Sequence, residues 1–196
     1  MRWLHEEIRK LGGTFQQRRV KSLDEEDCDL LVHCSVLAGL AAKDLAGDDT
    51  VFPIRGQIIN VHNPKLNELK MSVNKDGDHA YIIPRPNGDV VLGGTAQENN
   101  WSTENDTPNA EGVWERCCQL CPEVRNSVVM AKKAGLRPGR RGGVRLELEP
   151  VPTTRGAVLI HNYGHSGSGH TLHWGCAQEV VGLAKQYFPD NFASKL

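Results

Sequence analysis

The sequence has no excess of charge of either sign and no long apolar segment. Its 196 residues include 23 Lys and Arg against 24 Asp and Glu, which gives a formal net charge of −1. Without a basic excess, neither nucleic acid nor an anionic membrane is expected as the main partner. The longest apolar run, residues 36–42, is far shorter than the roughly 18 residues of a membrane-spanning helix. Residues 1–7 hold no apolar signal-peptide core. Hydrophobic residues at 39% and charged residues at 24% then predict an ordinary globular fold.

Neither a disulfide framework nor a zinc site is expected. Six cysteines are present, but no secretory signal favours disulfides. Cys118 and Cys121 form a CxxC pair, yet zinc needs a second pair of ligands at suitable spacing and none lies nearby. The segment before Pro122 has the pattern of a helix, so we expect buried, reduced thiols there.

Both ends of the chain have α/β character, whereas the middle has the pattern of an antiparallel sheet. Continuous apolar strands and amphipathic helices occupy the ends, and Gly12-Gly13 ends the first helix. In the middle, Pro86-Asn87-Gly88 is a tight turn between two apolar strands. The elements predicted are a helix at 3–11, strands at 14–20, 29–34, 55–61, 80–85 and 89–95, a helix at 109–121, strands at 144–148 and 157–161, and a helix at about 171–187.

These patterns predict a mixed fold class, α/β with α+β character. We expect an α/β domain with an antiparallel-sheet domain inserted into it. The first domain would hold residues 1–54 and, after the insertion, residues 144–196. The inserted domain would hold residues 55–143.

A glycine-rich turn joins the last strand to the last helix, at residues 163–170. Strand, glycine turn and helix together place backbone N–H groups and the positive end of a helix dipole beside an anion. The turn is not GxGxxG, so it is no standard pyrophosphate cradle, but it could face a flavin ring. The alternative is a tight connection without a ligand.

Four histidines lie within the same stretch of sequence. His161, His165, His170 and His173 fall within thirteen positions and could bind a metal. No carboxylate lies among them, and strand and helix separate the first from the last. Local hydrogen bonding is therefore the favoured interpretation, with a metal site as the alternative.

Arg137 and Tyr81 are candidates for binding a small carboxylate. A guanidinium matches a carboxylate bidentately, and a phenol can add a hydrogen bond to the same group. The alternatives are a surface arginine in a basic segment and a core aromatic with an exposed tip.

The C-terminal tripeptide Ser194, Lys195, Leu196 matches a peroxisomal import signal. The alternative is that these three residues occur there by chance.

Several motifs together resemble the family of D-amino-acid oxidases and D-aspartate oxidases. The resemblance rests on HNYGH at 161–165, on Gly167 and Gly169, and on HWGCA at 173–177. Further matching stretches follow in the family's order: RGQI at 55–58, YIIP at 81–84, LGG at 92–94, NW at 100–101, WE at 114–115 with CC at 117–118, GLRP at 135–138 and VRLE at 144–147.

The resemblance implies a partial FAD-binding Rossmann-like domain with an inserted antiparallel-sheet substrate domain. It also implies an FAD-dependent enzyme, in a peroxisome, that oxidises D-amino acids to 2-oxo acids, ammonia and hydrogen peroxide. In such an enzyme oxygen reoxidises the flavin, and the cofactor does the redox chemistry. Arg137 matches the carboxylate-binding arginine, Tyr81 the tyrosine beside it, and Gly167 the position whose carbonyl holds the substrate amine. The positions that match cofactor contacts are Val20, Ser35, Ser166, Gly167, Ser168, Gly169, His170 and Thr171.

The sequence departs from the family pattern at three places, and a fourth position bears on the choice of substrate. The family's opening βαβ unit with its GxGxxG turn is missing. We therefore expect an N-terminally truncated member that lacks a binding site for the ADP half of FAD. Residues 74–79 lack a second tyrosine, and Ser35-Val36 replaces a Thr-Gly pair. Ala96 stands where aspartate oxidases carry an extra arginine, which favours neutral substrates because a buried acid without a partner is costly.

Three hypotheses therefore stay open. The first is a D-amino-acid oxidase for neutral substrates, or a D-aspartate oxidase, with oxygen and the peroxisomal import receptor as partners and a homodimer as an open option. The second is a truncated, non-catalytic remnant that does not hold FAD. The third is a metal protein built on the histidines.

Overall fold

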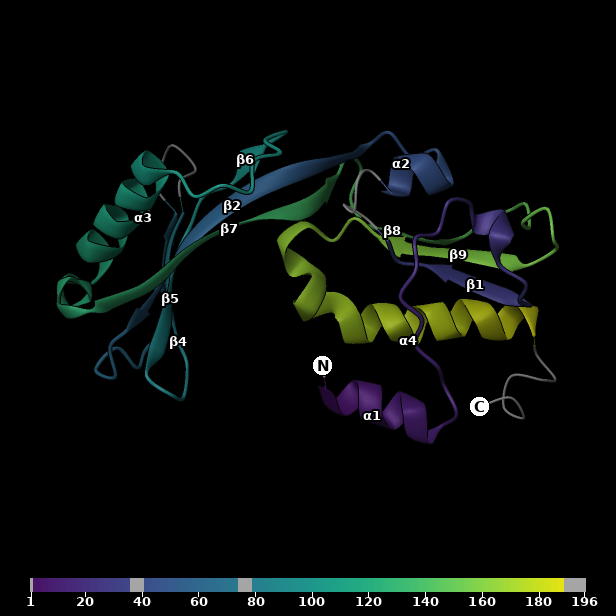
Figure 1. Ribbon diagram of the computed structural model, residues 1–196, viewed down its shortest axis with the longest axis horizontal. Coiled ribbons are helices and arrows are strands. Elements are labelled where there is room, and N and C mark those ends of the chain that lie inside the picture. The colour runs from purple at the N-terminus through teal and green to yellow at the C-terminus, as the bar shows by residue number, and fades with distance from the viewer. Residues whose placement is uncertain (1, 36–40, 74–78, 189–196) are drawn as a thin grey trace. The chain divides into compact units, whose positions relative to one another are not determined.

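The computed structural model describes residues 2–35, 41–73 and 79–188, and the chain divides into two compact units (Figure 1). Unit 1 is built from the two ends of the chain, up to residue 49 and from residue 143, without residues 165–167. Unit 2 is built from residues 50–142 together with residues 165–167. The first boundary falls earlier than the expected 54/55, because the first long strand of unit 2 begins at Val51. None of the described helices is long and apolar enough to cross a membrane.

Unit 1 contains a three-stranded sheet whose central strand is buried. The strands are β1 (Leu30–His33), β9 (Val158–Tyr163) and β8 (Arg145–Leu148), in the order β1-β9-β8. β1 runs parallel to β9, and β8 runs antiparallel to it. Helix α4 (Gly169–Tyr187) packs on β8 and β9. This mixed sheet agrees with the α/β character predicted for the chain ends.

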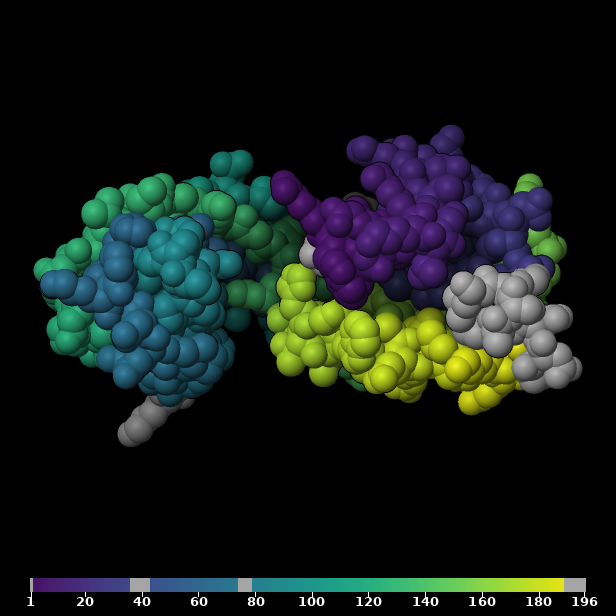
Figure 2. All heavy atoms as spheres, turned by 90° about the horizontal axis from the view of Figure 1, so that it is seen from below, coloured from purple at the N-terminus to yellow at the C-terminus, as the bar shows by residue number. Residues whose placement is uncertain are grey.

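The other elements of unit 1 are short and largely exposed. They are α1 (Arg2–Lys10), the 3-10 turn η1 (Leu23–Glu25) and α2 (Ala41–Ala46). Gly12 has a φ of +86°, which confirms the predicted glycine end of the first helix. Figure 2 shows α4, in yellow, at the surface of the molecule. Of the 19 residues of this helix, Ala184 is the one that is buried.

The strand predicted at 14–20 is wrong. These residues lie in neither a helix nor a strand, and most of them are exposed. The segment carries Phe15 and Val20 at its ends and four polar residues between them. It therefore has no apolar face that pairing into a sheet would bury, and its backbone stays outside both sheets.

Unit 2 contains a six-stranded antiparallel sheet organised around β2 (Val51–His62). β7 (Val128–Arg140) pairs with β2 along its whole length. β5 (Asp89–Gly93) and β6 (Gln97–Glu98) also pair with β2, β5 with its second half and β6 with its first half. The sheet continues from β5 to β4 (His79–Pro84) and β3 (Lys70–Val73).

One face of this sheet forms a core with α3 (Thr107–Leu120), which Figure 1 shows running across it. Asp106 caps the helix by accepting a bond from the backbone N–H of Asn109 at 2.9 Å. The 3-10 turn η2 (Pro122–Asn126) follows the helix. The core consists of Ile59, Val61, Leu66, Ile82, Val90 and Leu92 against Ala110, Val113, Cys117, Cys118, Cys121 and Val124. The three helix-end cysteines are thus buried thiols, as predicted.

Candidate functional site

The second face of the unit 2 sheet is lined by glycines and carries both predicted carboxylate-binding residues. Side chains alternate between the faces of a strand, and directly paired residues share a face. Ile82 and Leu92 point toward α3 and are fully buried. Tyr81, which pairs with Gly93, must then project from the opposite face. Arg137, which pairs with Ile54, projects from that same face, next to Gly56.

Arg137 lies across Gly56 and is fixed by a bond to the backbone. A Cβ atom at Gly56 would lie 2.5 Å from the guanidinium carbon, so glycine at this position is what allows the side chain to lie there. Nη1 of Arg137 donates to the carbonyl of Thr95 at 3.0 Å. This bond uses one of five N–H donors, and a bidentate carboxylate needs two. The side chain is half-buried, which leaves it accessible to a small ligand.

Tyr81 lies across the next pair of glycines. A Cβ atom at Gly93 would overlap the phenol ring, and one at Gly94 would lie 2.6 Å from the hydroxyl oxygen. The hydroxyl of Tyr81 therefore sits over Gly94, one residue before the carbonyl that Arg137 binds. The structure thus brings the two predicted substrate-binding side chains to one short segment, residues 93–95.

Gly167 lies beside the same arginine. Its Cβ position is 3.5 Å from Cδ and 3.8 Å from Nε of Arg137. Gly167 belongs to the 3-10 turn η3 (Ser166–Ser168), where Ser166 has a φ of +52°. All three predicted substrate-binding residues therefore lie in unit 2, with Gly167 against Arg137.

A buried arginine behind the sheet holds the loop that carries Thr95, and sequence reasoning missed its role. Arg55 is 1% exposed and donates to Oε1 of Gln57, Oε1 of Gln97, and the carbonyls of Ser102 and Glu104. None of these four acceptors is a carboxylate. The RGQI motif is part of the family resemblance, but the motif by itself does not show that the side chains of Arg55 and Arg137 project from opposite faces of the sheet.

That network extends directly to the segment that Arg137 bonds on the other face of the sheet. The backbone N–H of Gln57 donates to Oγ1 of Thr95 at 2.9 Å. The side chain of Gln57, fully buried, bonds both backbone groups of Asp106. The strand, the segment at residue 95 and the start of α3 are thereby held together by buried polar contacts.

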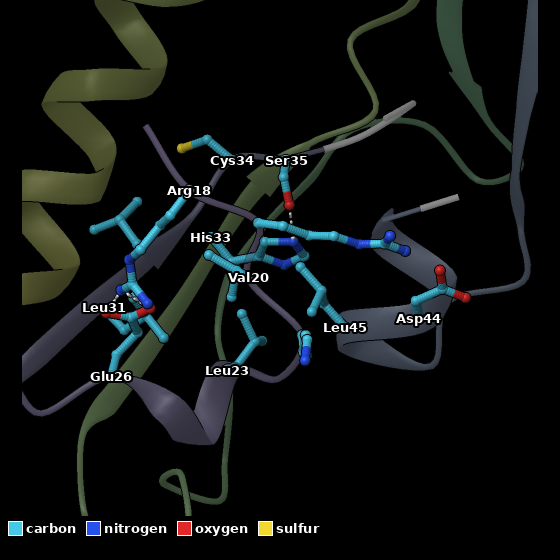
Figure 3. A pocket seen from close by; sticks show the side chains of 13 residues that line it. Arg18, Val20, Leu23, Glu26, Leu31, His33, Cys34, Ser35, Asp44 and Leu45 are labelled. Atoms are coloured by element: carbon cyan, nitrogen blue, oxygen red, sulfur yellow. Dashed lines mark hydrogen bonds and ion pairs between the residues drawn. The ribbon is translucent and has the colours of Figure 1, made fainter. Parts of the chain in front are cut away.

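Unit 1 contains a cavity of about 910 Å³ that includes two of the predicted cofactor contacts (Figure 3). Val20 and Ser35 both line it. Apolar side chains of Leu23, Leu31 and Leu45 form part of the wall. The charged residues of the wall are Arg18, Arg19, Lys21, Glu26 and Asp44, of which Arg18 bonds Glu26.

Two buried histidines behind Ser35 were not recognised as a pair from the sequence. Nε2 of His33 lies 2.6 Å from Oγ of Ser35, and the Nδ1 atoms of His33 and His161 are 3.1 Å apart. Nε2 of His161 lies 3.1 Å from Oε2 of Glu149. Burial, followed by the charges of His161 and Arg145, lowers the pKa of His33 to about 4.

The remaining predicted cofactor contacts lie in η3 and at the start of α4. Ser168 is its N-cap residue, and Gly169, His170 and Thr171 form the first turn. No side-chain cap bond is made at Ser168. Among the described residues that line the cavity of unit 1, none belongs to this turn. The structure thus places Val20 and Ser35 together, and Ser168 to Thr171 elsewhere.

The four predicted metal-candidate histidines do not gather. Within residues 2–35, 41–73 and 79–188, no group of three His, Cys, Asp or Glu side chains is placed to hold a metal ion. His173 bonds the carbonyl of His170 at 2.6 Å, and His161 bonds Glu149. The tripeptide Ser194, Lys195, Leu196 and most of segment 74–79 lie outside the described residues.

Comparison with known proteins identifies the family. The model of the family described as FAD dependent oxidoreductase matches residues 1–183. The chain belongs to this family. It is 49% identical over 184 residues to a D-amino-acid oxidase of Rubrobacter xylanophilus, covering 93% of this chain and 54% of the relative. It is 35% identical to a human D-aspartate oxidase, covering 94% of this chain and 52% of that protein. The chain spans about half the length of the curated relatives it matches.

Solved structures of other proteins show the same fold. A glycine oxidase from Bacillus cereus superposes with a TM-score of 0.67 at 19% identity, over 81% of this chain and 43% of that chain. An iminodiacetate oxidase from a Chelativorans species has a TM-score of 0.66 at 21% identity, over 82% and 43%. The family resemblance, the mixed fold class and FAD as the family's cofactor are thereby confirmed.

The cavity of unit 1 suits part of a flavin nucleotide. Its volume lies in the range of small-molecule sites, and such sites combine apolar walls with a few polar groups. Val20 and Leu31 offer an apolar surface to an aromatic ring system, and Ser35 offers a hydroxyl. Arg19 and Lys21 supply the cations that phosphates need. The residues that line the cavity therefore fit part of the cofactor of the family.

Proposed function

We propose that this chain acts in the FAD-dependent oxidative deamination of D-amino acids to 2-oxo acids, with release of ammonia and hydrogen peroxide. The observation that carries the proposal is the meeting of Arg137 and Tyr81 over residues 93–95, on a sheet face that glycines keep open. When bound, FAD supplies the acceptor for the hydride of the substrate Cα and passes the electrons to oxygen.

In this proposal the protein contributes orientation. Arg137 binds the substrate carboxylate through two N–H groups, and the Tyr81 hydroxyl donates to the same carboxylate. The carbonyl of Gly167, beside Arg137, accepts a hydrogen bond from the substrate amine. Three fixed contacts define one face of a chiral carbon, so one enantiomer presents its Cα hydrogen to the cofactor.

We assign the cofactor contacts to two groups of residues. Val20 and Ser35 contribute through the cavity of unit 1. Ser166, Gly167, Ser168, Gly169, His170 and Thr171 contribute through the turn and the first turn of α4, where backbone N–H groups and the helix dipole favour negative charge.

Neutral D-amino acids are the proposed substrates. Ala96 is exposed and directly follows Thr95, whose carbonyl positions Arg137. An alanine there offers no charge to a side-chain carboxylate. The higher identity to the D-amino-acid oxidase than to the D-aspartate oxidase points the same way. We further propose import into peroxisomes through residues 194–196.

The assay measures FAD binding and peroxide release by the purified chain. FAD is titrated against the protein by flavin fluorescence, and peroxide is followed with D-alanine, D-aspartate and, as a blank, L-alanine. We expect bound flavin and peroxide from D-alanine. A chain that binds no FAD and releases no peroxide would be the non-catalytic remnant, and peroxide from D-aspartate alone would make it an aspartate oxidase.

Two substitutions test the residue roles. Arg137→Gln should lower kcat/KM for D-alanine at least about 100-fold, because two charge-assisted hydrogen bonds are worth about 3 kcal/mol or more. Arg125→Gln, at an exposed arginine of the same unit, is the matched control and should change little. Ala96→Arg should shift preference toward D-aspartate about tenfold, and an unchanged ratio of the two substrates would contradict the assignment of Ala96.

A further inference from the structure

A continuous chain of hydrogen bonds runs from the wall of the unit 1 cavity into the core of that unit. It begins at the hydroxyl of Ser35, which faces the ring of His33 in Figure 3. It passes from His33 to His161 between their Nδ1 atoms, and from His161 to Oε2 of Glu149. His33 and His161 are 4% and 1% exposed, so water does not compete for these bonds.

The far end of this chain of hydrogen bonds is the carboxyl group of Glu149. Nη2 of Arg145 donates to Oε2 of Glu149 at 2.7 Å. The same guanidinium donates through Nε to Glu147 at 2.7 Å and through Nη1 to the Tyr163 hydroxyl at 3.0 Å. That hydroxyl in turn donates to Asp48 at 2.8 Å. Oε2 of Glu149 thus faces a guanidinium, which can only donate, and acts as a hydrogen-bond acceptor.

An accepting Glu149 sets the direction of every other bond. A neutral imidazole has one N–H donor and one accepting nitrogen. His161 must donate from Nε2 to Glu149, so its Nδ1 accepts. His33 must then donate from Nδ1, so its Nε2 accepts the hydroxyl proton of Ser35. The lone pairs of Ser35 are left for a ligand.

We propose that His33, His161 and Glu149 are positioning residues that make Ser35 a hydrogen-bond acceptor toward the cavity, so that the bound ligand meets it with an N–H or O–H group. The proposal deepens the cofactor contact assigned to Ser35 and rests on that assignment for the identity of the ligand alone. A serine by itself can donate or accept, and the buried pair removes that choice.

One added proton reverses the donor and acceptor roles along the chain of hydrogen bonds. If His161 is charged, its Nδ1 becomes a donor, so His33 must accept at Nδ1 and donate from Nε2 to Ser35. Ser35 is then free to donate into the cavity. The charged groups that face the pair are Arg145, Glu147 and Glu149. Burial, then Arg145, lowers the pKa of His161, and Glu149 and Glu147 oppose that shift, so the pair is neutral at pH 7.

Nitrogen NMR of the full chain labelled with 15N-histidine tests the proposal without FAD or substrate. At pH 7 we expect the proton of His161 on Nε2 and that of His33 on Nδ1, the tautomer that free histidine in water populates less. A proton on Nε2 of His33, or a charged ring at either position, would overturn the proposal. A failed FAD titration would leave this result standing, because the tautomers are read without ligand.

Two matched variants test whether His161 sets the tautomer of His33. His161→Phe keeps a ring of similar shape but removes the acceptor for Nδ1 of His33, so the His33 proton should move to Nε2. His62→Phe, at a half-exposed histidine of unit 2 that bonds Asp89, should leave the His33 signal unchanged. An unchanged His33 tautomer in His161→Phe would refute the assigned direction of the chain, and unfolding of that variant would leave the wild-type measurement to decide.

Discussion

Acid should destabilise unit 1 through His33 before it titrates the carboxylates. His33 is buried and neutral, and its pKa is about 4 against 6.5 in an unfolded chain. Above pH 6.5 both states are neutral at this position and the full stability is present. As the pH falls from 6.5 toward 4, the unfolded chain binds a proton that the folded chain does not, so stability is lost. A difference of about 2.5 pKa units corresponds to about 3 kcal/mol.

Urea unfolding at several pH values between 7.5 and 4 measures this loss of stability. Hydrogen exchange of the β9 amides monitors the unfolding of unit 1. His33→Asn removes the titrating group, so the unfolding free energy of this variant should fall by about 3 kcal/mol less than that of the wild type over the same range. His170→Asn, at an exposed histidine of α4, serves as the control and should change the unfolding free energy by about 0.5 kcal/mol or less. Equal pH dependence in wild type and His33→Asn would refute the claim that the pair is held neutral by burial.

Two further substitutions test the unit 2 face and the network behind it. Gly93→Ala would place a methyl group in the Tyr81 ring, so we expect a loss of 1–3 kcal/mol in urea unfolding and of turnover, whereas Gly135→Ala, where no atom lies within 4 Å, should cost about 0.5 kcal/mol or less. Arg55→Met would remove four buried hydrogen bonds, two of them to the carbonyls of Ser102 and Glu104, and should cost about 3 kcal/mol or more, against about 0.5 kcal/mol for the exposed Arg125→Met.

The elements that the sequence predicted well have a strong local signal. The hairpin between β4 and β5 has Gly88 at a φ of +83°, which its turn requires. Helix α3 begins at an aspartate cap followed by proline, and ends before a second proline. In each case the signal lies within a few residues of the element, and no distant contact was needed to recognise it.

Strand β7 lacks such a signal, although it is the longest strand of the structure. Its sequence carries Lys132 and Lys133 in the middle and Pro138 near the end, and much of it is exposed. Strand propensity is low for these residues. What makes it a strand is pairing along the whole of β2, a partner that lies about 70 residues earlier in the chain. Single-strand patterns do not contain that information.

The two arginines of neighbouring strands show why a site needs the sheet register. Arg55 and Arg137 differ by one position in pairing, since Arg55 pairs with Leu136 and Arg137 with Ile54. That single step sends Arg55 to the α3 side, where neutral acceptors surround it, and Arg137 to the opposite side, over Gly56. By residue type alone both could bind a carboxylate. The glycines decide between them, because a side chain can bind a ligand over a sheet only where its neighbours on that face leave space, and Arg55 has no such space.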